Sequence, residues 1–257
     1  MSERARKHVS VWPLLAALAA LVIVAVPELG SDPWEFEPGS IDSSGPFGWL
    51  VRIADYEWDV GLLRASALLA GLLVADFSRI LAGPYATMLL ADLGAEVVKV
   101  ESPDGDDTRS WPPFVEGEST YFMSVNRNKK SVTLNLKAPE GRRLLEALAR
   151  KSDVLLENFR TGTMDKLGFG YRALSRLNPR LVYCSVSGFG ESGPEAHRAG
   201  YDLVIQAESG VMDLTGFPDG PPVKVGNSIA DLVAGMAAAY GVVLALLART
   251  RTRRGQK

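Results

Sequence analysis

The chain has 257 residues, of which 47% are hydrophobic and 23% charged, as is typical of a globular protein with one large domain or two small ones. Its 28 basic and 30 acidic side chains leave a net charge of −2, so no overall positive field favours a nucleic-acid partner. A single cysteine, Cys184, excludes an internal disulfide. With only His8 and His197 as histidines, we expect no metal site and no nucleic-acid binding.

The N-terminal segment, residues 1–70, differs from the rest of the chain. A few basic residues precede an uncharged stretch at 11–27, which is the pattern of a signal peptide or a membrane anchor. The stretch is shorter than the roughly 20 residues that usually span a bilayer, so both interpretations stay open. Residues 28–59 lack periodicity and predict an irregular loop. We treat 1–70 as an N-terminal extension of unknown function, with membrane contact possible through 11–27.

Strands and helices alternate from Leu72 onward. LLVADFS predicts a buried strand, GPYATMLLADLGA a helix with Pro84 near its first turn and Gly94 at its end, and EVVKVE a second strand. The pattern repeats with SVTLNL, DVLLENF and LVYCSVS as strands, and with PEGRRLLEALARKS and YRALSRLNP as helices. Residues 71–257 are therefore predicted to form an α/β fold, a Rossmann-like parallel sheet with flanking helices.

Two common nucleotide sites are excluded by the loops. Glu101 ends the second predicted strand, where an acidic residue could contact a ribose, but the first turn reads DFSRILAGP and has no GxGxxG. A GxxxxGK[ST] loop is also missing from the sequence. We therefore expect neither an NAD cofactor nor P-loop nucleotide hydrolysis.

The most apolar element is the last one, the uncharged stretch Leu232–Ala248. Its length is borderline for a membrane span, and its alanines and glycines equally suit close packing inside a protein. Because an α/β pattern precedes it, we predict a buried core helix. Cys184, in LVYCSVS, is predicted to be a buried apolar residue of a strand, since no histidine lies near it in sequence.

Asp231 stands at the start of that helix, in KVGNSIADLVAG. Ser228 is placed as an N-cap with Asp231 three residues later, which is the spacing of a capping box. Acidic residues are common in the first turn of a helix, so the spacing by itself favours a structural role. The positive end of the helix dipole also favours an ionised carboxylate, which is the state that a nucleophilic aspartate requires.

Several longer motifs follow one another in a recognisable order. They are VADFSRILAGPYATMLLADLGAEVVKVE, NRNKKSVTLNLKAPEG, DVLLENFRTGTMDKLGFGY, NPRLVYCSVSGFGESGP, GYDLVIQAESGVM and RTRRGQ. Together they resemble the N-terminal half of family III CoA-transferases, a family that includes formyl-CoA and carnitine CoA-transferases and the α-methylacyl-CoA racemase branch. The resemblance covers about residues 72–257 and implies a truncated form of the family's α/β domain.

The resemblance implies a cytoplasmic enzyme that moves CoA between an acyl-CoA thioester and a carboxylic acid. In the family an aspartate attacks the thioester carbonyl to give an acyl-aspartyl anhydride. Released CoA thiolate then forms an aspartyl-CoA thioester, from which the acceptor acid is activated. The G-x-x-x-x-D segment of the family matches Gly226–Asp231, so Asp231 is the implied nucleophile. Asp202, in GYDLVIQ, is the second candidate and matches a position that lines the site.

The same resemblance implies a set of CoA contacts. One stretch matches family residues near the adenosine, a second matches those near the pantetheine and phosphates, and Arg79 matches a first-turn position that faces the cofactor. Cationic side chains suit the phosphates of CoA, although relatives often have arginine where this chain has Ser102. The implied CoA-site residues are Arg79, Leu134, Asn135, Leu136, Lys137, Asn158, Phe159, Arg160, Lys166, Tyr201 and Asp202.

Two alternatives to an active transferase stay open. The racemase branch pairs its aspartate with a histidine in a GHD motif, which here reads Gly200-Tyr201-Asp202. Tyrosine, with a pKa of about 10, is a poor base near neutral pH, and His197 is predicted to lie on the surface.

The second alternative is a catalytically incomplete fragment or membrane-anchored fusion. Relatives begin near Leu72 and continue past Lys257, and they assemble as interlocked homodimers of ring-shaped subunits. A half-length chain cannot close such a ring, so we expect little turnover from this chain alone. A signal sequence would also conflict with a cytoplasmic CoA-dependent enzyme.

Overall fold

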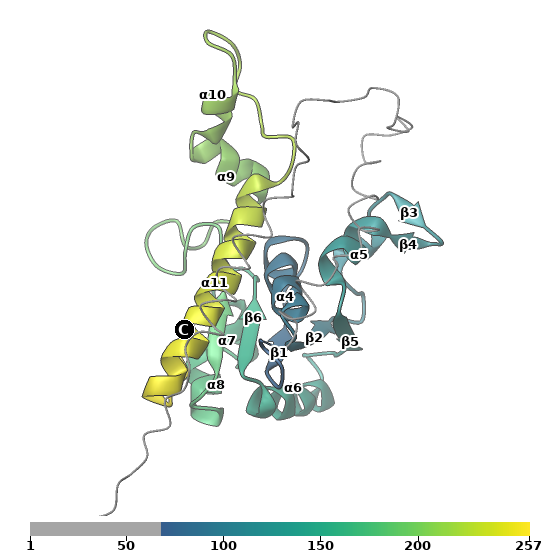
Figure 1. The fold of residues 1–257 in the computed structure, drawn as a ribbon, viewed down its shortest axis with the longest axis vertical. Helices are drawn as coiled ribbons and strands as arrows, with labels where there is room; N and C mark the ends of the chain where they lie inside the picture. The colour runs from purple at the N-terminus through teal and green to yellow at the C-terminus, as the bar shows by residue number, and fades with distance from the viewer. Residues whose placement is uncertain (1–67) are drawn as a thin grey trace, which may run out of the picture.

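A five-stranded parallel sheet forms the centre of the computed structural model, which describes residues 68–257 (Figure 1). The strand order is β5-β2-β1-β6-β7. The strands are β1 (Leu73–Asp76), β2 (Glu96–Glu101), β5 (Lys129–Thr133), β6 (Val154–Glu157) and β7 (Val182–Ser185). The predicted α/β fold with a parallel sheet is confirmed. The expectations for residues 1–67, including the apolar stretch at 11–27, lie outside the described residues.

Strands β1 and β6 are short and apolar except for one acidic residue at the carboxyl end of each, because helices cover both faces of the sheet. Val74 of β1 pairs in register with Val97 of β2 and with Val154 of β6, and all three side chains are buried. Continuous burial of this kind is characteristic of parallel sheets. From β1 the chain builds outward through β2 to β5, and then returns to place β6 on the other side of β1. The carboxyl ends of β1 and β6 thus form a topological switch point, where open α/β sheets bind ligands.

Within residues 68–257, two helices cover one face of the sheet and three cover the other. Helices α4 (Ala82–Asp92) and α11 (Ile229–Thr252) pack with one side of β1, β2 and β6 in the first apolar cluster. Helices α6 (Pro139–Lys151), α7 (Thr163–Leu167) and α8 (Tyr171–Leu177) pack with the other side in the second cluster. Alternation along each strand separates the two clusters, since Val74 joins the first and Ala75 the second.

Smaller elements extend from the carboxyl edge of the sheet (Figure 1). After β2 come the 3-10 helix η1 (Asp107–Ser110), a hairpin of β3 (Phe114–Val115) and β4 (Glu118–Ser119), and α5 (Thr120–Asn126). Before α11 come α9 (Asp202–Glu208) and α10 (Val211–Thr215), which project beyond the start of that helix. Of these elements, α9 contacts the start of α11 through Asp202, and α5 carries Tyr121, which feels the charge of Asp231.

Helix α11 runs across the sheet against α4. Within residues 68–257 it is the one helix whose length and apolar composition would suit a membrane span. The prediction of a buried core helix is confirmed for one face, which buries Gly235, Ala239 and Val242. The opposite face exposes Tyr240 (42%) and Leu244 (40%).

Contact between α11 and α4 depends on a glycine. A Cβ atom added to Gly235 would lie 2.6 Å from the carbonyl oxygen of Ala82, whereas one added to Gly241 would meet nothing within 4 Å. Because Gly235 is beside the first residue of α4, the start of α11 lies at the carboxyl edge of the sheet.

The far end of α11 is held by Arg249. This buried guanidinium forms an ion pair with Asp153 at 2.8 Å and donates to the carbonyl of Arg180 at 3.0 Å. Both partners precede strands, β6 and β7 respectively, so the contact fixes the helix at the amino edge of the sheet. After the helix the chain turns back beside β7, where Gly255 N–H donates to Pro179 and Tyr183 N–H to Gln256.

The two glycines of α11 predict opposite outcomes for the same substitution. Gly235→Ala should lower the free energy of unfolding by about 1–3 kcal/mol, because the added methyl forces α11 away from α4. Gly241→Ala should raise it by about 0.5–1 kcal/mol, because alanine is the better helix former at an open position. Urea unfolding of both variants measures the difference. Equal effects at the two positions would contradict close packing at Gly235.

Candidate functional site

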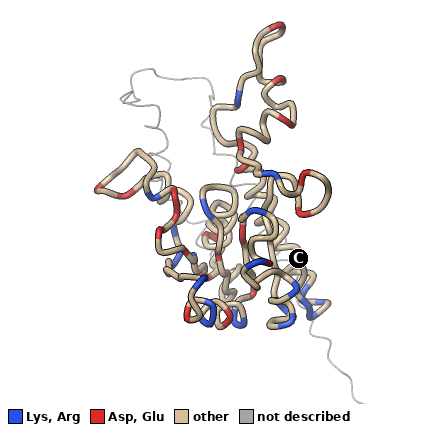
Figure 2. The backbone as a smooth tube through the Cα atoms, turned by 180° about the vertical axis from the view of Figure 1, so that it is seen from behind, with Lys and Arg blue, Asp and Glu red and all other residues tan. Residues whose placement is uncertain are grey.

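The carboxyl edge of the sheet gathers the loops that follow β1, β2 and β6, together with the start of α11. The sequence-predicted residues Arg79, Asn158, Asp202 and Asp231 all lie in these segments or in α9 beside them. Acidic and basic side chains are mixed over the described backbone (Figure 2).

The start of α11 is capped by a residue from another helix. Asp202 Oδ1 accepts the N–H of Ala230 at 2.9 Å and that of Asp231 at 3.3 Å. Ser228 occupies the N-cap position, with ψ of 68°, and its side chain makes no capping hydrogen bond. The predicted capping box of Ser228 and Asp231 is therefore wrong. Ser228 lacks the extended conformation usual at an N-cap. The Asp202 carboxylate of α9 accepts the N–H groups at the start of α11 instead.

This arrangement leaves the carboxylate of Asp231 free. Within the described part of the chain it makes no hydrogen bond, although the residue is half-buried. Burial, aided by the negative charge of Asp202, raises the pKa of Asp231 to about 6. The helix dipole is expected to favour the ionised carboxylate and so to lower its pKa. The pKa is raised instead, which corrects that expectation. Loss of solvent and a like charge outweigh the helix terminus.

An aromatic pair borders the same carboxylates. Burial, followed by the charge of Asp231, raises the pKa of Tyr121 to about 12, so this phenol of α5 stays protonated near Asp231. The ring of Trp111 packs against Tyr121 with 5.2 Å between ring centroids. Sequence reasoning did not single out either residue. Both lie far from Asp231 along the chain, and only the fold connects them with it.

Three of the predicted CoA-site residues meet at the turn after β1. Asn158 accepts the N–H of Arg79 through Oδ1 and donates Nδ2 to the Arg79 carbonyl, each at 2.8 Å. The Arg79 guanidinium lies 5.8 Å from the centroid of the Phe159 ring. Arg160, which follows directly, is exposed. The structure therefore brings together Arg79, Asn158 and Phe159 and leaves the Arg160 cation at the surface beside them.

The segment after β5 lies against the second apolar cluster, on the side of the sheet covered by α6, α7 and α8. Leu134 is buried, and both Leu136 and Phe159 pack against the cluster that contains it. Asn135 accepts the N–H of Lys137 at 3.0 Å and so forms a tight turn that leaves the Lys137 side chain exposed.

The remaining predicted residues are exposed. Lys166 lies on α7, and Tyr201, 63% exposed, directly precedes α9 next to Asp202.

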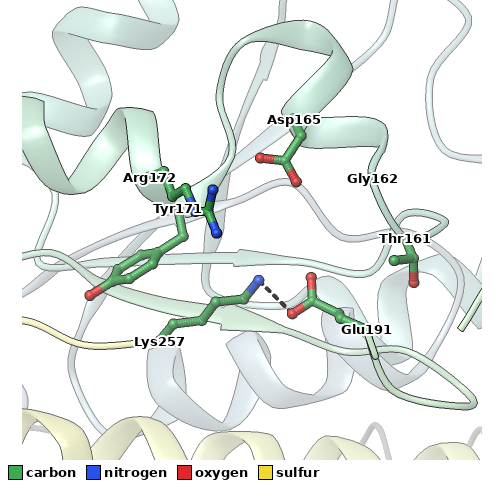
Figure 3. A pocket seen from close by; sticks show the side chains of 7 residues that line it. All are labelled: Thr161, Gly162, Asp165, Tyr171, Arg172, Glu191 and Lys257. Atoms are coloured by element: carbon green, nitrogen blue, oxygen red, sulfur yellow. Dashed lines mark ion pairs between the residues drawn. The ribbon is translucent and has the colours of Figure 1, made fainter. Parts of the chain in front are cut away.

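A pocket of about 400 Å³ lies beside α7 and α8, away from Asp231 (Figure 3). Glu191 and Lys257 form an ion pair within it. Its lining residues are Thr161, Gly162, Asp165, Tyr171, Arg172, Glu191 and Lys257. The pocket shares the 160–166 stretch with the predicted CoA contacts, but Asp231 is not part of its wall.

Other reactive groups are accounted for. Cys184, predicted to be a buried residue of a strand, lies in β7 and is only partly buried against the first apolar cluster, and burial raises the pKa of its thiol to about 12. His197 is exposed, as predicted. Residues 68–257 hold no group of three or more His, Cys, Asp or Glu side chains placed to bind a metal ion.

The raised pKa of Asp231 predicts a pH-dependent stability effect. Because the folded state holds this proton more tightly than the unfolded state, the ionised carboxylate costs stability above about pH 6. Asp231→Asn should therefore be more stable than wild type at pH 8, and the difference should vanish as the pH falls to about 4. Urea midpoints at both pH values test this, with Asp213→Asn on the exposed side of α10 as control. An unchanged midpoint at pH 8 would contradict the burial of this charge.

A family model described as CoA-transferase family III matches residues 69–257. The succinyl-CoA:glutarate CoA-transferase of Mus musculus is 52% identical over 73% of this chain and 43% of its own length. The acetyl-CoA:oxalate CoA-transferase of Acetobacter aceti is 52% identical over 72% of this chain and 48% of its own.

Solved structures extend the comparison to the fold. The crystal structure of a CAIB/BAIF family protein from Brucella suis matches with a TM-score of 0.71 and 49% identity, over 73% of this chain and 51% of that one. A hypothetical protein from Mycobacterium tuberculosis matches with a TM-score of 0.68 and 41% identity, over 73% of this chain and 52% of that one. The chain spans about half the length of the relatives it matches. With a family match over residues 69–257, the chain belongs to CoA-transferase family III.

Proposed function

We propose that this chain carries the reactive aspartate and the CoA-facing part of an enzyme that moves CoA between an acyl-CoA thioester and a carboxylic acid. The observation that supports the proposal is the free carboxylate of Asp231. This carboxylate lies at the carboxyl edge of a parallel sheet. It is not used to cap the helix, because Asp202 accepts the N–H groups at the start of α11.

The proposed reaction proceeds through covalent intermediates on Asp231. The ionised carboxylate attacks the thioester carbonyl and the C–S bond breaks. CoA departs as a thiolate, and the acyl group stays on Asp231 as an acyl-aspartyl anhydride. The thiolate attacks the aspartyl carbonyl and releases the donor acid, which leaves an aspartyl-CoA thioester. The acceptor carboxylate then displaces the thiolate, and the thiolate returns to the new acyl group and frees Asp231. Atoms balance without water or a net proton.

The environment of Asp231 suits this chemistry. A pKa of about 6 leaves the carboxylate mostly ionised at neutral pH, and it makes that carboxylate more basic, and so more nucleophilic, than an ordinary one. Asp202 contributes twice, because it fixes the first turn of α11 and adds a like charge. The protonated phenol of Tyr121 is a hydrogen-bond donor near the same groups.

CoA is the proposed ligand of the loops after β1, β5 and β6. Lys137, Arg160 and Lys166 are exposed cations suited to its phosphates, and Arg79 lies against Phe159 beside them. The amide of Asn158 is already bonded to the Arg79 backbone at both ends, so we assign it the role of shaping the turn. We propose a dicarboxylic acid as acceptor, because relatives are named for glutarate and oxalate.

A racemase is the second candidate and is less well supported. Moving an α-proton needs a base on each face of the carbon. The residue before Asp202 is a tyrosine, and His197 is exposed on the preceding loop. We also propose that the complete enzyme is cytoplasmic and an interlocked homodimer, and that this half-length chain alone turns over slowly if at all.

Covalent chemistry at Asp231 can be tested directly. Incubation of the chain with succinyl-CoA and then hydroxylamine should convert Asp231 to a hydroxamate, detected by peptide mass spectrometry. Asp231→Ala should abolish the adduct, whereas Asp213→Ala, on the exposed side of α10, should not change it. Absence of any adduct from a folded full-length version of the protein, with several acyl-CoA donors, would leave only a binding or structural role.

The pH dependence of this adduct tests the role of Asp202. Because Asp231 must be ionised to attack, the rate of adduct formation should rise through about pH 6. Asp202→Asn keeps an oxygen that can accept the two N–H groups of α11 but removes the negative charge, so the midpoint should move to lower pH. Quenched-flow measurements between about pH 4.5 and 8 compare the two proteins. A midpoint that stays in place would exclude charge coupling between the two carboxylates.

A further inference from the structure

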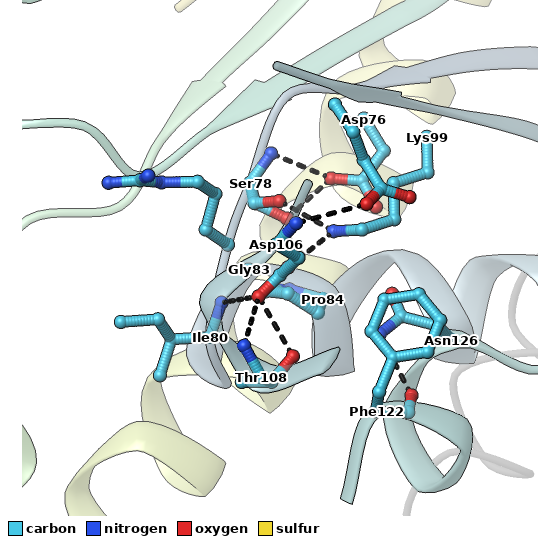
Figure 4. Close-up of polar contacts among 12 residues, drawn as sticks. Asp76, Ser78, Ile80, Gly83, Pro84, Lys99, Asp106, Thr108, Phe122 and Asn126 are labelled. Atoms are coloured by element: carbon cyan, nitrogen blue, oxygen red, sulfur yellow. Dashed lines mark hydrogen bonds and ion pairs between the residues drawn. The ribbon is translucent and has the colours of Figure 1, made fainter. Parts of the chain in front are cut away.

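The turn between β1 and α4 is held in place by side chains, as the close-up of its polar contacts shows (Figure 4). Ser78 N–H donates to Asp76 Oδ1 at 2.9 Å, and the Ser78 carbonyl accepts from Lys99 Nζ at 2.9 Å. Ile80 N–H is directed at Asp106 Oδ1, at 3.4 Å. Between these, both backbone groups of Arg79 bond to Asn158.

Five successive backbone polar groups, from Ser78 N–H to Ile80 N–H, therefore meet side chains that come from four different segments. A turn that makes its own backbone hydrogen bonds would keep its shape without such partners. This turn depends on them.

The backbone at Ile80 is strained. Its φ is 70°, and a β-branched residue in the left-handed region is an outlier that persists only when its surroundings impose it. The contacts on its amino side impose it here, because Lys99 holds the Ser78 carbonyl, Asn158 holds the Arg79 carbonyl, and Asp106 receives the N–H of Ile80 itself. Released from these contacts, the turn would relax to an ordinary conformation.

Three of these five contacts come from a buried set of four charges on the α4 side of the sheet, and the other two come from Asn158. Lys99 Nζ pairs with Asp106 Oδ2 at 2.8 Å, and Lys129 Nζ pairs with Asp76 Oδ2 at 3.1 Å. None of the four side chains is more than 2% exposed. Buried ions depend on their partners, because an unpaired charge in the interior is strongly unfavourable. The set is thus balanced and rigid, and it ends at the turn.

Each pair has a further bond that directs it. Lys129 Nζ donates to the carbonyl of Pro84 at 2.8 Å, in the first turn of α4. Asp106 Oδ1 accepts from both the N–H and the hydroxyl of Thr108, at 3.0 and 2.8 Å. Strand pairing by itself needs none of these bonds, since β1 is hydrogen-bonded to β2 and β6 along its length.

We propose that Lys99 and Asp106 are positioning residues of the CoA site. With Asp76 and Lys129 they form a buried clamp that holds the β1–α4 turn in its strained shape, so that Arg79 stays against Phe159 at the carboxyl edge of the sheet. The identity of the ligand rests on the proposed function. The mechanical role of the clamp rests on the turn itself.

The experiment compares the full chain with Lys99→Met and Asp106→Asn by hydrogen–deuterium exchange. In both variants the amides of residues 78–80 should exchange about tenfold faster, whereas those of β1 keep their rates. Calorimetry with CoA should show a dissociation constant raised about tenfold. Lys99→Arg keeps the charge and the hydrogen-bond donor, so it should restore much of the slow exchange and of the CoA affinity. If the effects came from a general loss of packing, this substitution would not restore them.

Matched controls come from an exposed ion pair on the same strands. Lys130 of β5 and Glu96 of β2 lie 2.7 Å apart at the surface, so Lys130→Met and Glu96→Gln should change neither the exchange at the turn nor CoA affinity. Asn158→Ala, which frees Arg79 from the exposed side, provides a reference for a released turn even if one buried variant fails to fold.

Two results would overturn the clamp. Wild-type exchange at residues 78–80 in folded Asp106→Asn is one, and equally accelerated exchange throughout β1 is the other, since it would mean general loosening of the core. Failure of the wild-type chain to bind CoA would instead count against the proposed function, because the exchange result judges the clamp without any ligand.

Discussion

The pairing of buried lysines with buried aspartates at the carboxyl edge of the sheet is the constraint on which the rest of this structure depends. Burial by itself would disfavour the ionised acids, yet Lys129 and Lys99 hold the pKa of Asp76 below its ordinary value, and Lys99 does the same for Asp106. No buried side-chain polar atom in residues 68–257 lacks a partner. A complete network of this kind contributes specificity of shape more than net stability. Its members select one geometry for the turn.

The start of α11 follows the opposite rule. Within residues 68–257 Asp231 makes no side-chain hydrogen bond and lies beside a second carboxylate, and its pKa rises to about 6. A structure optimised for stability alone would place a neutral side chain there. The two ends of the proposed site therefore differ, since fully paired charges hold the β1–α4 turn and one carboxylate at the start of α11 has no such partner among the described residues. Such a division is expected wherever a rigid frame must hold a destabilised group.

Much of the fold could be predicted from the sequence because strand and helix periods alternate clearly from Leu72 onward. The long helix could be predicted as well, since its apolar run is unbroken. Lys99 shows where local reasoning ends. In EVVKVE it reads as the polar position of an alternating strand, and only the neighbouring Asp76 and Asp106, placed by the fold, explain its burial. No spacing in the local sequence predicts that Lys99 forms this ion pair.

The candidate site could be predicted only unevenly, for the same reason. Family resemblance predicted Asp231 as the nucleophile. The start of its helix was predicted correctly, but the predicted capping residue was the nearby Ser228. The observed cap, Asp202, belongs to a separate helix and requires α9 to fold back over the start of α11. Tyr121 and Trp111 had no motif to mark them. Family resemblance predicted Arg79, Asn158 and Phe159 as members of one CoA site. Their contact at the β1–α4 turn depends on β6 lying beside β1, which the order of elements along the chain does not imply.

Helix α11 is attached at both ends by aspartates, Asp202 at its start and Asp153 near its end through Arg249. Its 24 residues correspond to a rod about 36 Å long. A rod anchored in this way transmits displacement along its axis, because helix hydrogen bonds stretch little. The position of the Asp231 carboxylate therefore depends on contacts at the amino ends of β6 and β7, at the opposite edge of the sheet.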